Sequence, residues 1–387
     1  MSDSLPTVWP AKQHTFAKHA ILRGYLEAWF PILSRQSAIL QRQFNMSSKG
    51  EILFIDAFAG PGEYENGEPG SPIIALRTAS QHEVQFPFPI RLLFIEKNKA
   101  RFANLQKVIE KEQIHGEKSQ SIILNDPKCG DCDDILNDLM NHYEKRAIKF
   151  GPCLAFMDKF GFSGVSMKLI SRIMKNSECE IFTLLEYQGM NRFIQDESKA
   201  DALTRAFGGD EWRDAQNLPE TEQRRFLIKK YIEAIKARGN TKYVCHFTMF
   251  DQDGRVLYWL IFCTNSLRGL EEMKKAMWKV DKSGECRFSD QEKPDQLSLM
   301  EVSFTQSWLA EVLGKEFKKK TLTAMQVKEY VLTETPCHKF KQALSELESG
   351  KESYIDVINA PADRKRGSFP NGDLEKIEIH FKSDLLF

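Results

Sequence analysis

Residues 51–62 read EILFIDAFAGPG. The first eight form an almost continuous apolar run rich in Ile, Leu and Phe, which is typical of a β-strand buried on both faces. Gly60 and Gly62 follow directly and favour a tight turn. At the carboxyl edge of a parallel sheet, such a turn forms one wall of a ligand crevice. This stretch therefore predicts an α/β domain with a binding site beside Asp56.

The same pattern recurs along the next 130 residues. Helical patterns separate the runs, and this alternation predicts a parallel sheet with crossover helices. Two β-rich runs then flank the turn 251–254 and predict a hairpin. Five parallel strands followed by a hairpin is the chain order of Rossmann-like class I methyltransferases, whereas a dinucleotide dehydrogenase repeats a second βαβ half. The further strands are expected at 90–97, 121–126, 153–159, 180–187, 243–250 and 255–264, and the helices at 70–80, 98–112, 132–147 and 165–176.

The chain divides into four predicted parts. Residues 1–50 carry an N-terminal helix at 14–44, with Pro31 as an expected kink. Residues 51–190 and 243–298 form the Rossmann-like domain, and 191–242 form a helical insertion. Residues 299–387 show three helical patterns, a strand at 353–359, a basic loop and a last strand at 376–381, which predicts a winged helix. The basic loop holds Arg364, Lys365 and Arg366, expected to contact phosphates of nucleic acid.

Composition narrows the class of protein. The 387 residues carry 54 basic and 54 acidic side chains, so net charge gives no indication of a nucleic-acid partner. One Cys-x-x-Cys pair is present, Cys129 and Cys132, whereas a zinc site needs four ligands, so no metal is expected. The sequence shows no signal-peptide pattern and no apolar run of membrane-spanning length. We therefore expect a cytoplasmic protein with reduced thiols.

The turn after the first strand predicts cofactor-binding residues. Its glycine spacing differs from G-x-G-x-x-G, which favours S-adenosylmethionine over NAD. Glu96 ends the second strand, where a carboxylate can accept both ribose hydroxyls, although it can also serve the start of the next helix. Asp126 follows the third strand and can bind an adenine amino group or only turn the chain before Pro127. The predicted cofactor residues are Asp56, Phe58, Ala59, Gly60, Gly62, Glu96 and Asp126.

The fourth strand ends in Met157-Asp158-Lys159-Phe160-Gly161-Phe162. An Asp at this edge can accept hydrogen bonds from an exocyclic amine and align its lone pair on a methyl donor. Because methyl transfer depends largely on positioning, Asp158 is the predicted catalytic residue, with Phe160 stacking on the base. Phe162 is an alternative for the stacking role, and a plain loop with a core Phe is the alternative for the whole segment.

These segments together resemble the three-Cys-motif partner protein family. The likeness runs from about residue 12 to the C-terminus, and it implies a methyltransferase-like protein whose partner is a radical-SAM-like protein with a three-cysteine motif. The stretches that carry it are Phe54–Gly62, Gly70–Leu76, Phe94–Lys97, Asp158–Gly161, Asn191–Phe193, Phe207–Trp212 and Met273–Lys279.

Part of the pattern is also similar to the bacterial 23S rRNA adenine-N6 methyltransferases. The shared features are a Lys-His pair on the N-terminal helix (Lys18-His19), the turn Ala59–Gly62 and the segment Gly70–Pro72. This resemblance implies that Asp158 holds the target amine. Lys159 departs from both patterns, because proline is expected there, and this departure bears on turnover more than on cofactor binding.

The sequence thus predicts an S-adenosylmethionine-dependent N-methyltransferase acting on a nucleic-acid base, together with a three-Cys-motif partner. The alternative is a non-catalytic methyltransferase-like subunit that docks that partner. An NAD-dependent enzyme is disfavoured by the glycine turn and the strand order.

Overall fold

The computed structural model describes residues 6–44, 52–112, 121–147, 150–159, 161, 164–281, 286–289, 306–349 and 353–382. The chain forms two compact units. The first, called the sheet unit, comprises Met1–Val280 with Phe288–Glu292, and the second, called the C-terminal unit, comprises Asp281–Arg287 with Lys293–Phe387. The predicted boundary at 298/299 lies outside the described residues.

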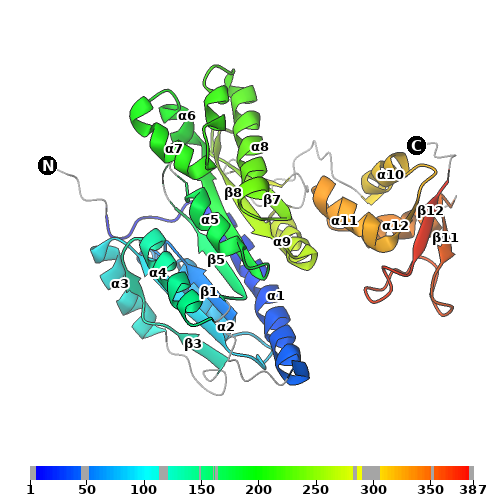
Figure 1. Cartoon of the computed structure of the whole chain (residues 1–387), viewed down its shortest axis with the longest axis horizontal. Coiled ribbons are helices and arrows are strands. Elements are labelled where there is room, and N and C mark those ends of the chain that lie inside the picture. The colour runs from blue at the N-terminus through cyan, green and yellow to red at the C-terminus, as the bar shows by residue number, and fades with distance from the viewer. Residues whose placement is uncertain are drawn as a thin grey trace. The chain divides into compact units, whose positions relative to one another are not determined.

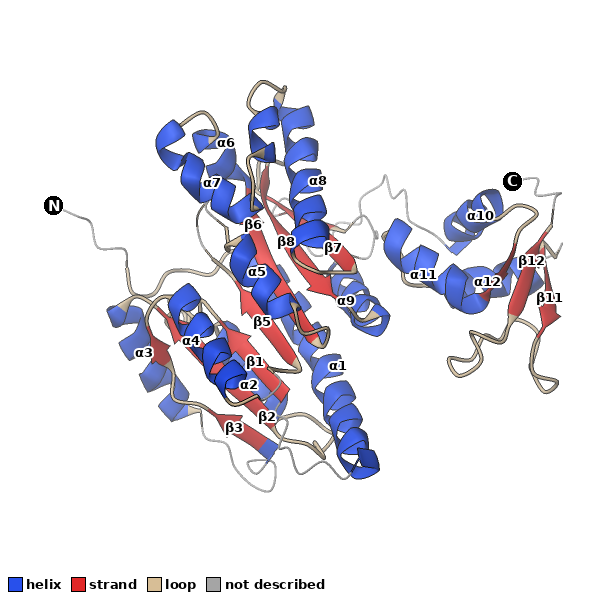
Figure 2. Cartoon of the chain, viewed as in Figure 1, coloured by secondary structure: helices blue, strands red, loops and turns tan. Residues whose placement is uncertain are grey.

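The sheet unit is built around one large, mostly parallel sheet (Figure 2). The strands run in the order β3-β2-β1-β5-β6-β8-β7-β9, and the short β4 pairs with β2. β1, β2, β3, β5 and β6 are parallel, whereas β8 is antiparallel to both β6 and β7. The strands are β1 (Ile52–Asp56), β2 (Ile90–Glu96), β3 (Ile122–Leu124), β4 (Lys128–Cys129), β5 (Cys153–Met157), β6 (Cys179–Glu186), β7 (Tyr243–Phe250), β8 (Val256–Thr264) and β9 (Arg287–Ser289).

Helices cover both faces of this sheet (Figure 1). α1 packs against both α2 and α9 on one face, and α5 packs against α7 and α8 on the other. The helices are α1 (Gln13–Phe44), α2 (Ser71–Ser80), α3 (Lys99–Lys111), α4 (Cys132–Lys145), α5 (Met167–Met174), α6 (Tyr187–Phe193), α7 (Ala200–Phe207), α8 (Glu220–Arg238) and α9 (Leu267–Val280), with the 3-10 turns η2 (Glu197–Lys199) and η3 (Glu211–Ala215).

The core explains why these runs become strands. All five residues of β1 are buried, and so are all five of β5, its neighbour. Leu53 and Ile55 point to the face covered by α4, α5 and α8, where a single apolar cluster extends as far as Tyr231. Phe54 points the other way and meets Phe30 of α1 with ring centroids 6.5 Å apart. A strand in this position must be apolar on both faces, as the sequence indicated.

The C-terminal unit has three helices and a small antiparallel sheet. Its elements are α10 (Gln306–Glu316), β10 (Thr321–Thr323), α11 (Ala324–Glu334), α12 (Phe340–Ser349), β11 (Ile355–Asn359) and β12 (Glu378–Phe381). β12 lies between β10 and β11. Thr323 begins α11 with a capping box, in which its side chain and that of Gln326 each accept the other's backbone N–H.

The predicted Rossmann-like fold, with five parallel strands followed by a hairpin, is confirmed by this strand order. Each expected strand forms within two residues of its predicted start, and the hairpin closes at 251–254. Three short strands, β4, β9 and β10, were not predicted. Each has fewer than four residues, too few for an alternating pattern to be visible in the sequence. Within the described parts of the chain, no helix is long and apolar enough to cross a membrane.

Candidate active site at the carboxyl edge of the sheet

Asp56 is the last residue of β1, and its side chain is fully buried. The Phe58 N–H donates to its Oδ1 at 3.3 Å, while Oδ2 has no hydrogen-bond partner among the described residues. Burial raises the pKa of this carboxyl to about 7, against the opposing effects of the Ser71 hydroxyl and the Phe58 N–H. Asp56 is therefore a buried acid that changes its charge near neutral pH.

The glycine turn is built for backbone conformations that other residues rarely adopt. Gly60 and Gly62 have φ of 64° and 86°. The Gly70 N–H donates to the Gly62 carbonyl at 2.8 Å, and a Cβ on Gly70 would lie 2.9 Å from that oxygen. Gly70 thereby joins the turn to the start of α2, which places Ser71 beside Asp56. Apart from Gly60 and its two chain neighbours, no atom of the described residues lies within 4 Å of the position that a Cβ on Gly60 would take, so the backbone there is open to a ligand.

Glu96 is tied to this turn. Its Oε2 accepts the Gly60 N–H at 2.9 Å and its Oε1 accepts the Asn98 N–H at 2.6 Å. The cap of α3 is Asn98 itself, whose side chain accepts two backbone N–H groups of the first turn. Because each carboxylate oxygen of Glu96 accepts one hydrogen bond from the backbone, lone pairs remain for a ligand.

Asp126 lies farther from this arrangement along the chain. It follows β3 and is exposed. The loop returns to β2 at Cys129, which pairs with Glu96, and the Gly130 N–H donates to the Glu96 carbonyl at 3.2 Å. The residues brought beside Glu96 are thus 129 and 130, and the role of Asp126 stays a prediction.

Asp158 follows β5, the strand next to β1, and forms a buried ion pair with Lys18 of α1. Only 7% of Asp158 and 4% of Lys18 are exposed. Its other oxygen, Oδ1, is buried and has no hydrogen-bond partner among the described residues. Asp158 and Lys18 both act electrostatically on Asp56, so the three groups form one cluster at the carboxyl edge. Phe160 and Phe162, the predicted stacking residues, lie outside the described residues.

Lys159 points away from this cluster. Its Nζ donates to the Gly164 carbonyl at 2.7 Å, within its own loop. Burial lowers its pKa, as does the positive charge of Arg205. Lys159, which replaces the expected proline, thus bonds to its own loop and is affected by the charge of Arg205 on α7.

A cavity of about 280 Å³ opens beside this cluster. Burial raises the pKa of its Glu186 carboxyl, and burial together with the charges of Asp158 and Asp56 raises that of the Tyr64 hydroxyl. The cavity is lined by three large aromatic rings, by further polar side chains and by one buried lysine. These lining residues include Trp9, Tyr64, Tyr258, His14, Glu186 and Lys18.

The sequence did not predict the cavity residues Trp9, Tyr64 and Tyr258 as site residues, nor the roles of Lys18 and Ser71. Lys18 is the partner of Asp158, and Ser71 stands beside Asp56. A signal for Lys18 existed: with Ile21, Leu22 and Tyr25 it lies on the buried face of α1, where an unpaired lysine is rare. Its neighbour His19 is also buried, and burial lowers its pKa to about 3, so it is neutral.

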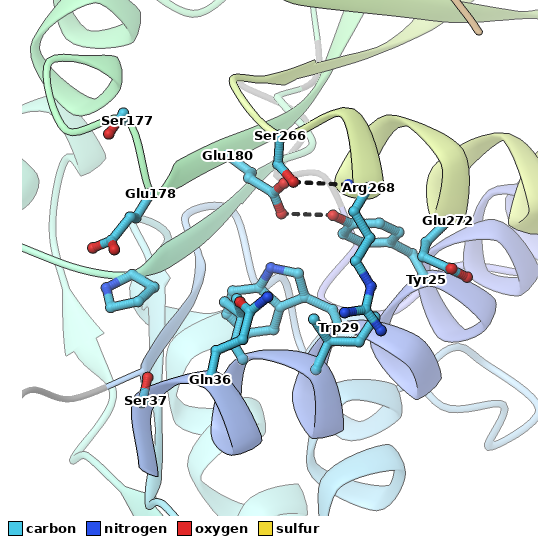
Figure 3. Close-up of a pocket in the computed structure, with 14 residues that line it drawn as sticks. Tyr25, Trp29, Gln36, Ser37, Ser177, Glu178, Glu180, Ser266, Arg268 and Glu272 are labelled. Atoms are coloured by element: carbon cyan, nitrogen blue, oxygen red, sulfur yellow. Dashed lines mark hydrogen bonds between the residues drawn. The ribbon is translucent and has the colours of Figure 1, made fainter. Parts of the chain in front are cut away.

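A second cavity, of about 180 Å³, lies at the opposite, amino edge of the sheet (Figure 3). Glu180 at its wall accepts hydrogen bonds from Tyr25 and Thr264, both at 2.6 Å. Burial raises the pKa of this carboxyl, and the two hydroxyls oppose the rise. These bonds join α1 and β8 to β6, which is a sufficient structural role for Glu180.

The predicted wing residues of the C-terminal unit differ in exposure. The Arg364 guanidinium forms an ion pair with Glu348 of α12, lies 4.5 Å from the centroid of the Phe369 ring, and leaves 7% of its side chain exposed. Arg366 donates to the Glu348 carbonyl at 2.7 Å. Lys365 is exposed. Arg364 therefore anchors the loop, and Lys365 and Arg366 are the two of these cations that are exposed on its surface.

No protein-family model matches the sequence, and no curated protein matches it significantly. Among solved structures, the chain is similar to a putative methyltransferase from Porphyromonas gingivalis W83 (11% identity, TM-score 0.26, 60% of this chain and 41% of that one). It is also similar to Trm1 from Pyrococcus horikoshii in complex with S-adenosyl-L-methionine (12%, 0.32, 72% and 61%). A third is a putative O-methyltransferase from Klebsiella pneumoniae (12%, 0.27, 66% and 92%). The chain spans less than two thirds of the first two. The fold assignment rests on the strand order, and both family resemblances stay predictions.

Proposed function

We propose that this chain is an S-adenosylmethionine-dependent N-methyltransferase that acts on a base in nucleic acid. The observation that carries the proposal is the pair of buried carboxyls, Asp56 and Asp158, at the ends of adjacent strands beside an open glycine turn. Each has an oxygen without a partner among the described residues. Leaving such atoms unsatisfied costs about 1–3 kcal/mol each, so ligand donors are the natural partners.

The residues at the first two strand ends fit the cofactor. Glu96 retains lone pairs for the two ribose hydroxyls, and Asp56 Oδ2 can accept the ammonium of the methionine part. The open side of Gly60 lets the ligand approach the backbone. When bound, S-adenosylmethionine supplies an electrophilic methyl group on a sulfonium.

Asp158 would hold the acceptor. An exocyclic amine that enters the cavity can donate to Asp158 Oδ1, which orients the nitrogen lone pair toward the methyl group. Lys18 holds the other carboxylate oxygen and so fixes the rotation of the side chain. The rings of Trp9, Tyr64 and Tyr258 offer faces on which an unpaired base can stack.

The C-terminal unit and the partner extend this proposal. The order of helices and strands in the C-terminal unit supports a winged helix, in which the exposed Lys365 and Arg366 would contact phosphates. The three-Cys-motif protein implied by the family resemblance is the proposed partner, and the cytoplasm the proposed location.

A specific observation supports the alternative, a non-catalytic subunit that docks the three-Cys-motif protein. Asp158 is held in a buried ion pair with Lys18, and Lys159 replaces the proline of the related motif. In that case the cluster would stabilise the fold and the cavity would not admit a base.

Transfer of a radiolabelled methyl group from S-adenosylmethionine to mixed-sequence RNA and DNA oligonucleotides separates the two. For an enzyme, Asp158→Ala abolishes transfer while calorimetry shows unchanged cofactor affinity. Asp138→Ala, an exposed change on α4, is the matched control and keeps both. Transfer that survives in Asp158→Ala would contradict the catalytic assignment, and absence of transfer by the wild type would favour the subunit.

A further inference from the structure

A second feature of the sheet unit carries a strong positive charge. A groove of about 700 Å³ runs over α4, α5 and the end of α7, helices that lie on the same face of the sheet (Figure 1). The only carboxylate among its described lining residues is Asp133, which accepts a hydrogen bond from Ser166 at 3.1 Å. The basic side chains that line it are Lys168, Arg172, Lys175 and Arg205.

Three of these four cations lack a counter-charge. Lys168, Lys175 and Arg205 are exposed and form no ion pair with any described carboxylate. Arg172 differs, because it bonds to side chains of α4 and pairs with Glu144 at 3.1 Å. Three exposed cations and Arg172 thus face a single carboxylate, Asp133, among the described lining residues, which gives the groove a local excess of positive charge.

Arg205, which lines the groove, also acts on the loop that follows Asp158. Lys159, half-buried in that loop, feels the positive charge of Arg205, and this repulsion adds to burial in lowering its pKa. Two cations are therefore held close enough to repel each other, which a bound anion would relieve. Lys159, whose presence the catalytic chemistry does not explain, therefore lies near the Arg205 end of the groove without lining it.

The spacing suits a chain of anions better than a single one. Lys168 and Lys175 are seven residues apart on and just beyond α5, which corresponds to about 10 Å along a helix. A stacked nucleic-acid strand carries about three phosphates over that length. The three unpartnered cations match that number.

We propose that this groove, with Lys168, Lys175 and Arg205 as contacts, binds the phosphodiester backbone of a nucleic-acid strand. The bound strand would continue from Arg205 toward the cavity beside Asp158, since Arg205 acts on Lys159, the residue that follows Asp158. This inference rests on the proposed function, because it assigns the substrate's backbone to a surface outside the catalytic cluster.

Fluorescence anisotropy of a labelled single-stranded 20-mer between 50 and 300 mM NaCl tests the proposal. The triple variant Lys168→Ala/Lys175→Ala/Arg205→Ala removes three phosphate contacts. Its slope of log affinity against log salt is expected to fall by about 2 units, since each contact contributes about 0.7. Affinity at 0.1 M salt is expected to fall about 10- to 100-fold.

The matched control removes the same charge from α8, through Arg225→Ala/Lys229→Ala/Lys236→Ala, all exposed positions. It is expected to keep wild-type slope and affinity within about twofold, because none of these three side chains lines the groove. Equal losses in both triple variants, or wild-type binding by the groove variant, would overturn the proposal. Binding of ADP at the groove without binding of the oligonucleotide would overturn it as well.

The same samples separate this inference from the proposed function. Oligonucleotide binding that depends on the groove, without any methyl transfer, would uphold the groove and reject the enzyme. Methyl transfer to a free nucleoside, with oligonucleotide affinity unaffected by the groove variant, would uphold the enzyme and reject the groove.

Discussion

The substitution Asp56→Asn should change how the stability of the protein depends on pH. Burial raises the pKa of Asp56 from 3.8 to about 7. Between these values the folded protein holds this proton and the unfolded chain has lost it, so stability falls as pH rises. A rise of about 3 in the pKa corresponds to about 4 kcal/mol in the free energy of unfolding. This stability is fully present below pH 4 and is lost as the pH rises past 7.

Urea unfolding at half-unit intervals from pH 4.5 to 7.5 measures this effect. The free energy of unfolding of the wild type should decrease relative to Asp56→Asn by about 1.4 kcal/mol per pH unit. Asparagine has the same shape and does not titrate, so the difference between the two proteins isolates this group. Asp138→Asn, at an exposed position, should follow the wild type. Parallel pH profiles for wild type and Asp56→Asn would refute the assignment of a raised pKa.

The same proton should govern cofactor affinity. If the ionised form of Asp56 accepts the ligand's ammonium, the apparent affinity scales with its ionised fraction. With a pKa of about 7, that fraction is about 3% at pH 5.5 and about 90% at pH 8, so the ratio of the two dissociation constants is about 30. Calorimetry with Asp56→Asn as reference removes the ligand's own titration. An affinity with the same pH profile in both proteins would mean that Asp56 does not touch the cofactor.

Three further predictions concern stability and are measured by urea or thermal unfolding. Lys18→Met leaves a buried carboxylate unpaired and should cost about 3–5 kcal/mol, most of it recovered when Asp158→Asn is added; additive losses would argue against the ion pair. Gly70→Ala places a methyl 2.9 Å from the Gly62 carbonyl and should lower the free energy of unfolding by about 1–3 kcal/mol. The control Gly24→Ala in the helix α1, where the nearest contact of the new methyl is at 3.4 Å, should be neutral or stabilising. Equal effects of the two substitutions would contradict the close contact between Gly70 and Gly62. Arg364→Ala should lower the stability of the C-terminal unit by about 3 kcal/mol. An unchanged melting temperature would mean that the ion pair between Arg364 and Glu348 does not stabilise this unit.

The strand order was predictable because a central strand is buried on both faces, so that nearly every one of its residues is apolar. β1 and β5 are apolar throughout, and the acid at the end of each marks the edge where the chain turns. The hairpin was equally visible, because its turn holds two aspartates and a glycine between β-rich runs. The sequence therefore predicts that Asp56 and Asp158 lie at the same edge of the sheet.

Contacts between distant segments were not predictable. Lys18 lies 140 residues from Asp158 in the sequence, and no hydrophobic periodicity of the chain indicates that the two residues pair. Arg364 is one of three basic residues in a row, and only the fold shows that its guanidinium is turned onto Glu348. The groove over α5 is likewise invisible in the sequence, since Arg205 reaches it from a different helix.

The most direct test of the account is a calorimetric titration of the full chain with S-adenosylmethionine at pH 8, where Asp56 is ionised. The account predicts one site per chain with affinity in the range of about 1 μM to 1 mM, lost in Asp56→Ala. Absence of heat with the wild type, or equal binding by the variant, would contradict the placement of the cofactor at the glycine turn.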